Sequence, residues 1–333
     1  MRNDKVSNEA AKEQRMFGQI VIGPPGSGKS TFCHGMYQFL SALGRKSCIV
    51  NLDPANEHQA YPSCALDIRD TISIDQVMTK HGLGPNGALV HSFESMYENT
   101  LKAFAKAIED LSSSGNYLIF DCPGQVELFT HEKSFHRIFD VLTSKYDARL
   151  CVVSLVDSVY LTNATQYISI TLLTLRSMLQ LGLPQVNVIS KIDKLKEYGI
   201  LPMPLDYYTA AEDLQCLDQQ IQEESSGKLG KNLVKLTKLV GHVVEDFGIV
   251  NYEVLSVEDK RLMMNLLEKI DRANGYIFGT NELSGDSLWR QAVFNGQSFQ
   301  DDNVTLQERW IDQKSYFDGV QRTENKDLHS TTL

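Results

Sequence analysis

The most constraining feature of this 333-residue chain is a glycine-rich loop, Gly23-x4-Gly28-Lys29-Ser30, directly after an apolar run that favours a β-strand. The glycines allow backbone N–H groups to turn inward around a polyphosphate, and a following helix adds its positive N-terminal end. Lys29 would reach the β- and γ-phosphates, and the Ser30 hydroxyl would bind Mg²⁺. The sequence therefore predicts binding of a nucleoside triphosphate. The residues expected to bind it are Gly23, Gly26, Ser27, Gly28, Lys29, Ser30 and Thr31.

Short apolar runs alternate with helical patterns along the chain, which predicts a mostly parallel sheet wrapped by helices, an α/β fold of the P-loop NTPase class. Continuous apolar runs such as residues 151–156 fit central strands that are buried on both faces. The expected strands are 19–22, 47–52, 117–120, 150–156, 186–189 and 253–255. The main expected helices are 29–43, 88–111, 164–181 and 258–273.

Composition divides the chain into three parts. Residues 1–15 are charged and lack the apolar core of a secretory signal, so we expect a flexible extension. Residues 16–280 carry the nucleotide motifs and include, at about 194–251, a charged helical insertion expected to be an interaction surface. Residues 281–333 form a polar C-terminal extension, expected to be partly disordered. Within it, the apolar group around Trp310 could dock back or meet a partner.

Bulk properties exclude several classes of protein. The net charge of −10 argues against direct nucleic-acid binding, and no apolar run is long enough to span a membrane. The six cysteines lack metal-ligand spacing, which is typical of a protein in a reducing compartment. We therefore expect a soluble cytoplasmic protein that can shuttle to the nucleus.

The motif Asp121-Cys-Pro-Gly124-Gln125 follows the predicted strand at 117–120. An acidic residue at the carboxyl end of a strand beside a P-loop is placed to hold Mg²⁺ through water, and Gly124 can give its N–H to the γ-phosphate. Gln125 and Glu127 then stand where a hydrolytic water needs orientation. The alternative is an ordinary Asp-x-Pro-Gly turn, which is common in loops.

The motif Ser190-Lys191-Ile-Asp193 follows the predicted strand at 186–189 and indicates guanine recognition. The carboxylate of Asp193 can accept from N1–H and from the 2-amino group of guanine, whereas adenine would leave it unsatisfied. The usual first residue is Asn, and Ser190 cannot make the same amide contacts to the P-loop. Ser256, after the last strand, could close over the base edge.

Two further segments have no single interpretation from the residues alone. Asn51-Leu-Asp53-Pro-Ala-Asn56 ends the second strand, and Asp67-Ile-Arg-Asp70 follows in an expected loop. Either is a switch segment or a solvated acidic turn. Gly84-Pro85-Asn86-Gly87 precedes a long predicted helix, and on its own it is best explained as a turn with helix capping.

Taken in order, these motifs resemble those of the GPN-loop GTPases over about residues 16–280. The resemblance implies a SIMIBI-like P-loop fold, GTP and GDP as substrate and product, and Mg²⁺ as cofactor. It implies that Asp53, Gln125 and Glu127 hold the attacking water and that Asp121 is linked to the metal through water. It also implies a pseudo-symmetric dimer in which the GPN loop, Gly84, Pro85 and Asn86, reaches the partner's site.

The resemblance further implies partners. Members of the family pair with paralogous GPN-loop GTPases or with themselves, and they act in the assembly and nuclear import of RNA polymerase II and III.

The residues leave two other functions open. One is a nucleotide-stabilised scaffold with incidental hydrolysis. The other is a P-loop small-molecule kinase, which the lack of arginine in residues 194–251 disfavours because a kinase lid is usually basic.

Overall fold

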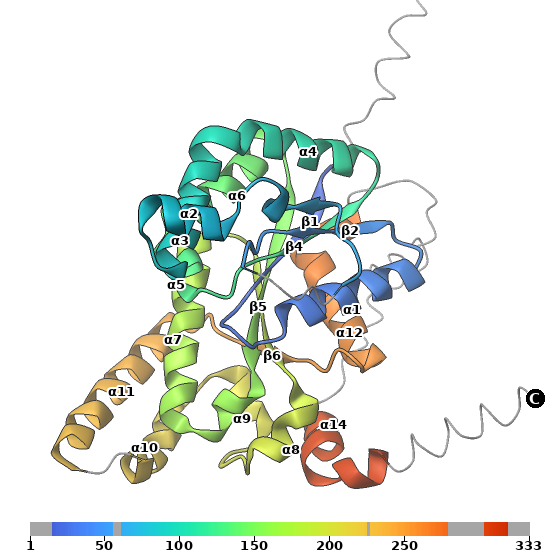
Figure 1. Cartoon of the computed structure of the whole chain (residues 1–333). Helices are drawn as coiled ribbons and strands as arrows, with labels where there is room; N and C mark the ends of the chain where they lie inside the picture. Colours follow the sequence, from blue (N-terminus) through green and yellow to red (C-terminus); the bar gives the residue numbers. More distant parts are fainter. Residues whose placement is uncertain (1–14, 56–60, 225–226, 279–302, 319–333) are drawn as a thin grey trace, which may run out of the picture.

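The computed structural model describes residues 15–55, 61–224, 227–278 and 303–318. Its centre is a sheet of seven strands in the order β3-β2-β4-β1-β5-β6-β7, in which all neighbouring strands are parallel (Figure 1). The predicted α/β class with a parallel sheet is therefore confirmed. The strands are β1 Phe17–Ile22, β2 Ser47–Asn51, β3 Leu66–Asp67, β4 Tyr117–Asp121, β5 Arg149–Asp157, β6 Gln185–Ser190 and β7 Tyr252–Val254.

Helices cover the sheet and create two hydrophobic clusters. One cluster joins the sheet to α1, α7 and α12, and the other joins it to α3, α4 and α6 (Figure 1). The central strands contribute to both clusters because their side chains alternate between two buried faces. The helices around the sheet are α1 Lys29–Ala42, α2 Ile74–His81, α3 Pro85–Ser95, α4 Leu101–Ser113, α5 Val126–Thr130, α6 Lys133–Lys145, α7 Ala164–Leu181 and α12 Lys260–Ala273.

Two local predictions were wrong. The segment 67–70, expected as a loop, contains the end of β3 and a 3₁₀ turn at Ile68–Asp70. The helix expected at 88–111 is divided by a π-helical turn at Met96–Thr100 into α3 and α4. Helix α3 also starts earlier than predicted, at Pro85, because proline at the first helical position loses no intrahelical hydrogen bond.

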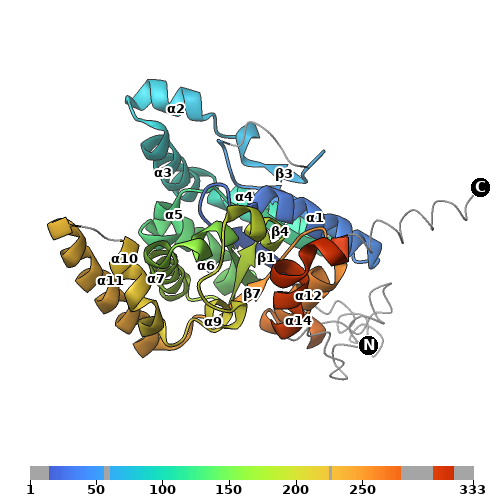
Figure 2. The same cartoon turned by 90° about the horizontal axis from the view of Figure 1, so that it is seen from below.

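The segment expected as an insertion is helical. It contains α8 Leu195–Tyr198, α9 Leu205–Ala210, α10 Asp218–Glu224 and α11 Gly227–Phe247. The helix expected at 206–224 is interrupted where Ala211 and Asp213 adopt positive φ angles of 53° and 51°. Helices α10 and α11 project from the body of the molecule (Figure 2). The role of this segment as an interaction surface stays a prediction.

The C-terminal segment 303–318, which begins with α14 Asn303–Gln307, packs on the α/β body formed by the sheet and its helices. Trp310 is only 6% exposed and belongs to the same cluster as α1 and α12, so the apolar group around it docks back. Two predictions fall outside the described residues. One is a flexible segment at 1–15, of which only Arg15 is described, and the other is disorder near the C-terminus. Within the described residues, none of the helices is long and apolar enough to cross a membrane.

Candidate active site

The strand order brings the predicted site residues to one edge of the sheet. Val21 and Asn51 both lie in register with Asp121, and Asp157 lies in register with Ser190. Because all strands are parallel, the loops after β2, β4, β1, β5, β6 and β7 leave from the same edge. Ligands of open α/β sheets bind at this carboxyl edge. The separate sequence motifs therefore belong to one site.

The loop after β1 has the backbone of a phosphate-binding loop. Gly23, Gly26 and Gly28 have positive φ angles of 147°, 79° and 90°, in the region that favours glycine. A Cβ atom on Gly23 would lie 2.2 Å from the carbonyl oxygen of Leu155, so a side chain is excluded there. Gly28 is the N-cap of α1, which directs the start of this helix at the loop.

Lys29 is held inside this loop with only 8% of its surface exposed. Its Nζ donates to the carbonyl oxygens of Gly23 and Pro24, at 3.1 and 3.2 Å. Burial lowers the pKa of Lys29, while the charges of Asp121 and Asp53 act in the opposite direction. The ammonium group is therefore positioned before any phosphate arrives, and two weak carbonyl contacts can be exchanged for charged phosphate oxygens.

Asp121 is the candidate metal-linked carboxylate, and it is 1% exposed. The Tyr61 hydroxyl lies 3.1 Å from its Oδ2, whereas its buried Oδ1 finds no hydrogen-bond partner among the described residues. Burial raises the pKa of Asp121, and the nearby Ser30 and Tyr61 hydroxyls and the charge of Lys29 lower it. A buried, unsatisfied carboxylate oxygen near Ser30 fits the water shell of Mg²⁺, which prefers oxygen ligands.

The metal would take few protein ligands. The described part of the chain contains no group of three or more His, Cys, Asp and Glu side chains that could hold an ion. Mg²⁺ in nucleotide sites is usually held by one or two protein groups, substrate phosphates and water. Ser30 and Asp121 would supply the protein part of such a shell.

Asp53 follows β2 and is supported by a polar network. Its backbone N–H donates to the Asn51 side chain at 3.1 Å, and its Oδ1 accepts from the backbone of Ala55 at 3.0 Å. The buried Asn51 also donates to Asp67, which pairs with Arg69 at 2.6 Å. Burial raises the pKa of Asp53, and the charges of Lys29 and Arg69 lower it. Asp67 is therefore a support for the loop that carries Asp53 rather than a solvated turn residue.

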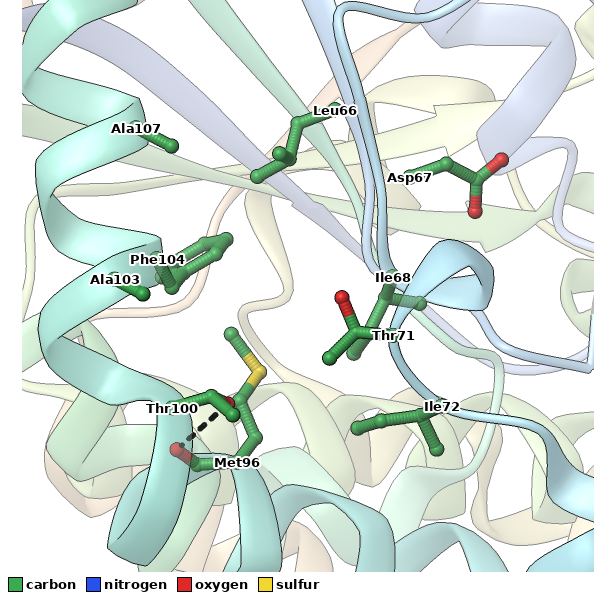
Figure 3. A pocket seen from close by; sticks show the side chains of 10 residues that line it. All are labelled: Leu66, Asp67, Ile68, Thr71, Ile72, Met96, Thr100, Ala103, Phe104 and Ala107. Atoms are coloured by element: carbon green, nitrogen blue, oxygen red, sulfur yellow. Dashed lines mark hydrogen bonds between the residues drawn. The ribbon is translucent and has the colours of Figure 1, made fainter.

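A mostly apolar pocket of about 230 Å³ lies beside this network (Figure 3). It lies between β3 with the following 3₁₀ turn on one side and α4 with the π-helical turn on the other. In the π-helical turn, the Thr100 hydroxyl lies 3.3 Å from the carbonyl oxygen of Met96. The residues that line the pocket are Leu66, Asp67, Ile68, Thr71, Ile72, Met96, Thr100, Ala103, Phe104 and Ala107.

Ser190 contacts the P-loop, although it lacks the amide group of the usual Asn. Its hydroxyl lies 2.8 Å from the carbonyl oxygen of Ser27 and 3.1 Å from that of Val156. Serine reaches the loop because Ser190 ends β6 beside β5, close to the bottom of the loop, where a short side chain is sufficient. The loop is thus tied to the guanine motif by a hydroxyl instead of an amide.

The rest of the guanine motif lies beside this contact. Lys191 donates from Nζ to the carbonyl oxygen of Gly26 and forms an ion pair of 2.7 Å with Asp157. Asp193 lies on a 3₁₀ turn at Ile192–Lys194 and is partly exposed. Ser256 is buried after β7, and the preceding residue, Leu255, accepts from the backbone of Ile192 at 3.2 Å. The structure therefore brings Lys191, Asp193 and the Ser256 loop together.

The GPN loop lies against the Asp121 motif of its own chain. Gly84 is the N-cap of α3, and the Asn86 Oδ1 lies 3.4 Å from Nε2 of Gln125 at the surface. Asn86, Gln125 and Glu127 share a hollow of about 430 Å³. On the P-loop side, a Cβ atom on Gly124 would lie 3.1 Å from Nζ of Lys29. The roles of these residues, in one chain or across two, stay predictions.

Two site residues were missed from the sequence. Tyr61 is buried and bonds Asp121, but a lone tyrosine after a run of polar residues in the sequence carries no signal of this contact. Asp157 pairs with Lys191 from the end of β5. An acidic residue at the end of a predicted buried strand was a usable signal, because the same reasoning selected Asp121.

Comparison with known proteins identifies relatives over most of the chain. Residues 21–276 match the family described as "Conserved hypothetical ATP binding protein". "GPN-loop GTPase 2" of Saccharomyces cerevisiae is 52% identical over 303 residues, which cover 91% of this chain and 86% of that protein. The proteins of the same name from Schizosaccharomyces pombe and Danio rerio are 45% and 44% identical, over 91% and 89% of this chain and 93% of each relative.

A solved structure shows the same fold. The GTPase from Pyrococcus abyssi, determined in the apo form, superposes with a TM-score of 0.59 over 77% of this chain and 97% of its own. The two sequences are 23% identical, so this likeness carries the fold and nothing finer.

Proposed function

The chain belongs to the GPN-loop GTPase family and is a GTP-hydrolysing enzyme, and we propose that hydrolysis takes place at the P-loop edge of the sheet through the residues described above. The observation that carries this proposal is the arrangement around Lys29. Its buried ammonium group lies in the P-loop near the charges of Asp121, which ends β4, and of Asp53, which follows the neighbouring strand β2.

The proposed reaction is in-line attack of water on the γ-phosphorus, with cleavage of its bond to the oxygen shared with the β-phosphate. Lys29 and the backbone N–H of Gly124 bind the phosphate oxygens that gain charge. Asp53, Gln125 and Glu127 hold the attacking water in line. Ser30, and Asp121 through water, would hold Mg²⁺, which when bound would offset the charge on the phosphates.

We propose that the enzyme selects guanine nucleotides through Asp193. The contacts of Ser190 and Lys191 with the P-loop fix the distance between phosphate and base subsites, which supports this assignment. Calorimetry should show that GDP binds at least about 100-fold more tightly than ADP, because ADP leaves the carboxylate without its two donors. Comparable affinities would contradict the proposal.

We also propose that the active form is a dimer, with a paralogue or with a second copy, and that Asn86 acts on the partner's site. The proposal rests on the family resemblance and on the exposed position of Asn86 beside Gln125. Turnover of GTP should rise with protein concentration or on addition of a paralogue. A rate per chain that is independent of both would contradict dimer dependence.

We propose that the cellular role is assembly of RNA polymerase II, and of polymerase III, in the cytoplasm before nuclear import, on the strength of the family resemblance alone. The test is to deplete the protein and follow the largest polymerase subunit, which should accumulate in the cytoplasm. Re-expression of the native chain should restore its nuclear position, and a Gln125→Leu chain should not. Rescue by both would favour a scaffold whose hydrolysis is incidental.

A further inference from the structure

The C-terminal segment 303–318 lies beside the predicted guanine motif. In Figure 1, α14 lies beside α8 and α9, the helices that follow the Asp193 turn, and α14 packs against α9. Leu306 and Trp310 are buried in the cluster that also contains Leu195 and Leu205. The segment is therefore part of the wall next to the base subsite, although it lies more than 100 residues further along the chain.

Polar contacts fix the segment in this position. Oε1 of Gln307 accepts from the backbone of Leu205 at 2.9 Å, which satisfies a free N–H at the start of α9. Arg309 pairs with Asp318 at 3.0 Å and lies 4.4 Å from the ring of Trp310. These contacts hold the helical turn that follows, which carries Lys314.

Lys314 donates from Nζ to the backbone carbonyl oxygen of Asp193. The other backbone bonds of the three-residue turn that carries Asp193 are made by the residues that flank Asp193. The Ile192 N–H donates to Leu255, and the Lys194 N–H closes the turn on Lys191. A charge-assisted bond from Lys314 to the middle residue therefore restrains the peptide from which the Asp193 side chain extends.

We propose that Lys314 is a positioning residue for guanine recognition, through which the C-terminal segment sets the orientation of the Asp193 carboxylate. The inference rests on the proposed pairing of Asp193 with guanine. A carboxylate that pairs with two donors at once requires its plane to be fixed, and a small rotation of its backbone lengthens one of the two bonds. Lys314 thus acts on selectivity through Asp193 without touching the nucleotide.

The experiment compares the dissociation constants of GDP and IDP for the full-length native chain and three variants. IDP lacks the 2-amino group, so it offers Asp193 only one of the two donors. Lys314→Ala should weaken GDP binding by about three- to tenfold and IDP binding by less, which narrows the ratio of the two constants. Lys314→Arg retains a cationic donor and should restore most of the ratio. Lys196→Ala removes an exposed lysine of α8 and is the matched control.

Each outcome is decisive. An unchanged ratio in Lys314→Ala, whether both nucleotides bind as before or both weaken equally, overturns the positioning role. Failure of Lys314→Arg to recover the ratio overturns the role of the cationic donor. A native chain that binds GDP, IDP and ADP equally well overturns guanine recognition by Asp193 and this inference with it, whereas a GDP-selective native chain with an insensitive Lys314→Ala variant overturns the inference alone. Melting temperatures of the variants show whether the segment remains docked.

Discussion

The two sides of the proposed active site are built differently. On the phosphate side, Lys29 and Asp121 are buried and are bonded to backbone or to a buried hydroxyl at 3.1–3.2 Å. On the water side, Asn86 and Glu127 are exposed, and the Asn86 to Gln125 contact is 3.4 Å long. Groups that bind the phosphates must be in place before the substrate arrives, whereas the set of groups that orients the water can be completed after binding. The difference predicts tight binding by one chain and slow turnover until a partner closes the open side.

The two sides also differ in how strongly their charged groups depend on one another. Burial raises the pKa of both Asp53 and Asp121 and lowers that of Lys29, so each of these charges depends on the others. Removing one of them disturbs the whole phosphate side. Glu127 lies at the surface, where water screens its charge, so its removal should affect the reaction alone.

The largest expected effect is the loss of Lys29. Lys29→Ala removes the charge over the β- and γ-phosphates and the cation that Asp53 and Asp121 share, so GTP affinity should fall by about 100-fold or more. Calorimetric titration with GTP and Mg²⁺ measures this. Lys46→Ala, which removes an exposed lysine bonded to the Ser114 carbonyl, is the control and should bind normally. Retention of tight GTP binding by Lys29→Ala would contradict the phosphate-side assignment.

The water side should respond in turnover instead of affinity. Gln125→Leu and Glu127→Ala should each slow hydrolysis by about 100-fold while the dissociation constant of GTP changes less than about threefold. Single-turnover phosphate release and nucleotide titration separate the two quantities. Glu98→Ala, on the exposed side of the π-helical turn, should change neither. If either water-side variant lost binding as completely as Lys29→Ala, its assignment to the water would be wrong.

Asn86 tests whether the water side belongs to one chain or two. Asn86→Ala should lower turnover by about tenfold without weakening GDP, because GDP has no γ-phosphate to contact. A turn residue would instead cost a little stability and leave turnover unchanged. Turnover, GDP titration and melting temperature together distinguish the two.

Mixing experiments then assign the chain. An Asn86→Ala chain combined with a Gln125→Leu chain forms dimers in which both lesions fall on the site of the Gln125→Leu chain, if Asn86 acts across the interface. The other site is intact, so an equal mixture should recover about one quarter of the native rate. No gain, with mixed dimers shown to form by size-exclusion chromatography of differently tagged chains, would assign Asn86 to its own chain, where the structure places it beside Gln125.

The sequence predicted those parts of the fold and site that depend on local patterns. Strands β1, β4 and β5 are mostly apolar runs, and Lys29, Asp121 and Asp193 each lie at or shortly after the end of a strand at a recognisable spacing. The rest depends on tertiary contacts. The two-residue strand β3 is too short to show a period, and its pairing with β2 is set by the fold. The bond from Lys314 to Asp193 joins residues 121 positions apart, and no spacing rule reaches so far.

The contact of Ser190 with the P-loop also depends on tertiary structure. Substitution of Ser190 has the smallest predicted effect on nucleotide binding. Serine lacks the amide group of the usual Asn, yet the end of β6 places its hydroxyl 2.8 Å from the Ser27 carbonyl oxygen. Ser190→Ala should remove one neutral hydrogen bond and weaken GDP and IDP equally, by about two- to fivefold, since the bond restrains the phosphate loop and not the base. Ser41→Ala removes a hydroxyl of α1 that bonds the carbonyl oxygen of Tyr37 in the same helix, and it is the control. A larger loss of affinity for GDP than for IDP would show that Ser190 acts on the base. The assignment of Ser190 to the phosphate subsite would then be wrong.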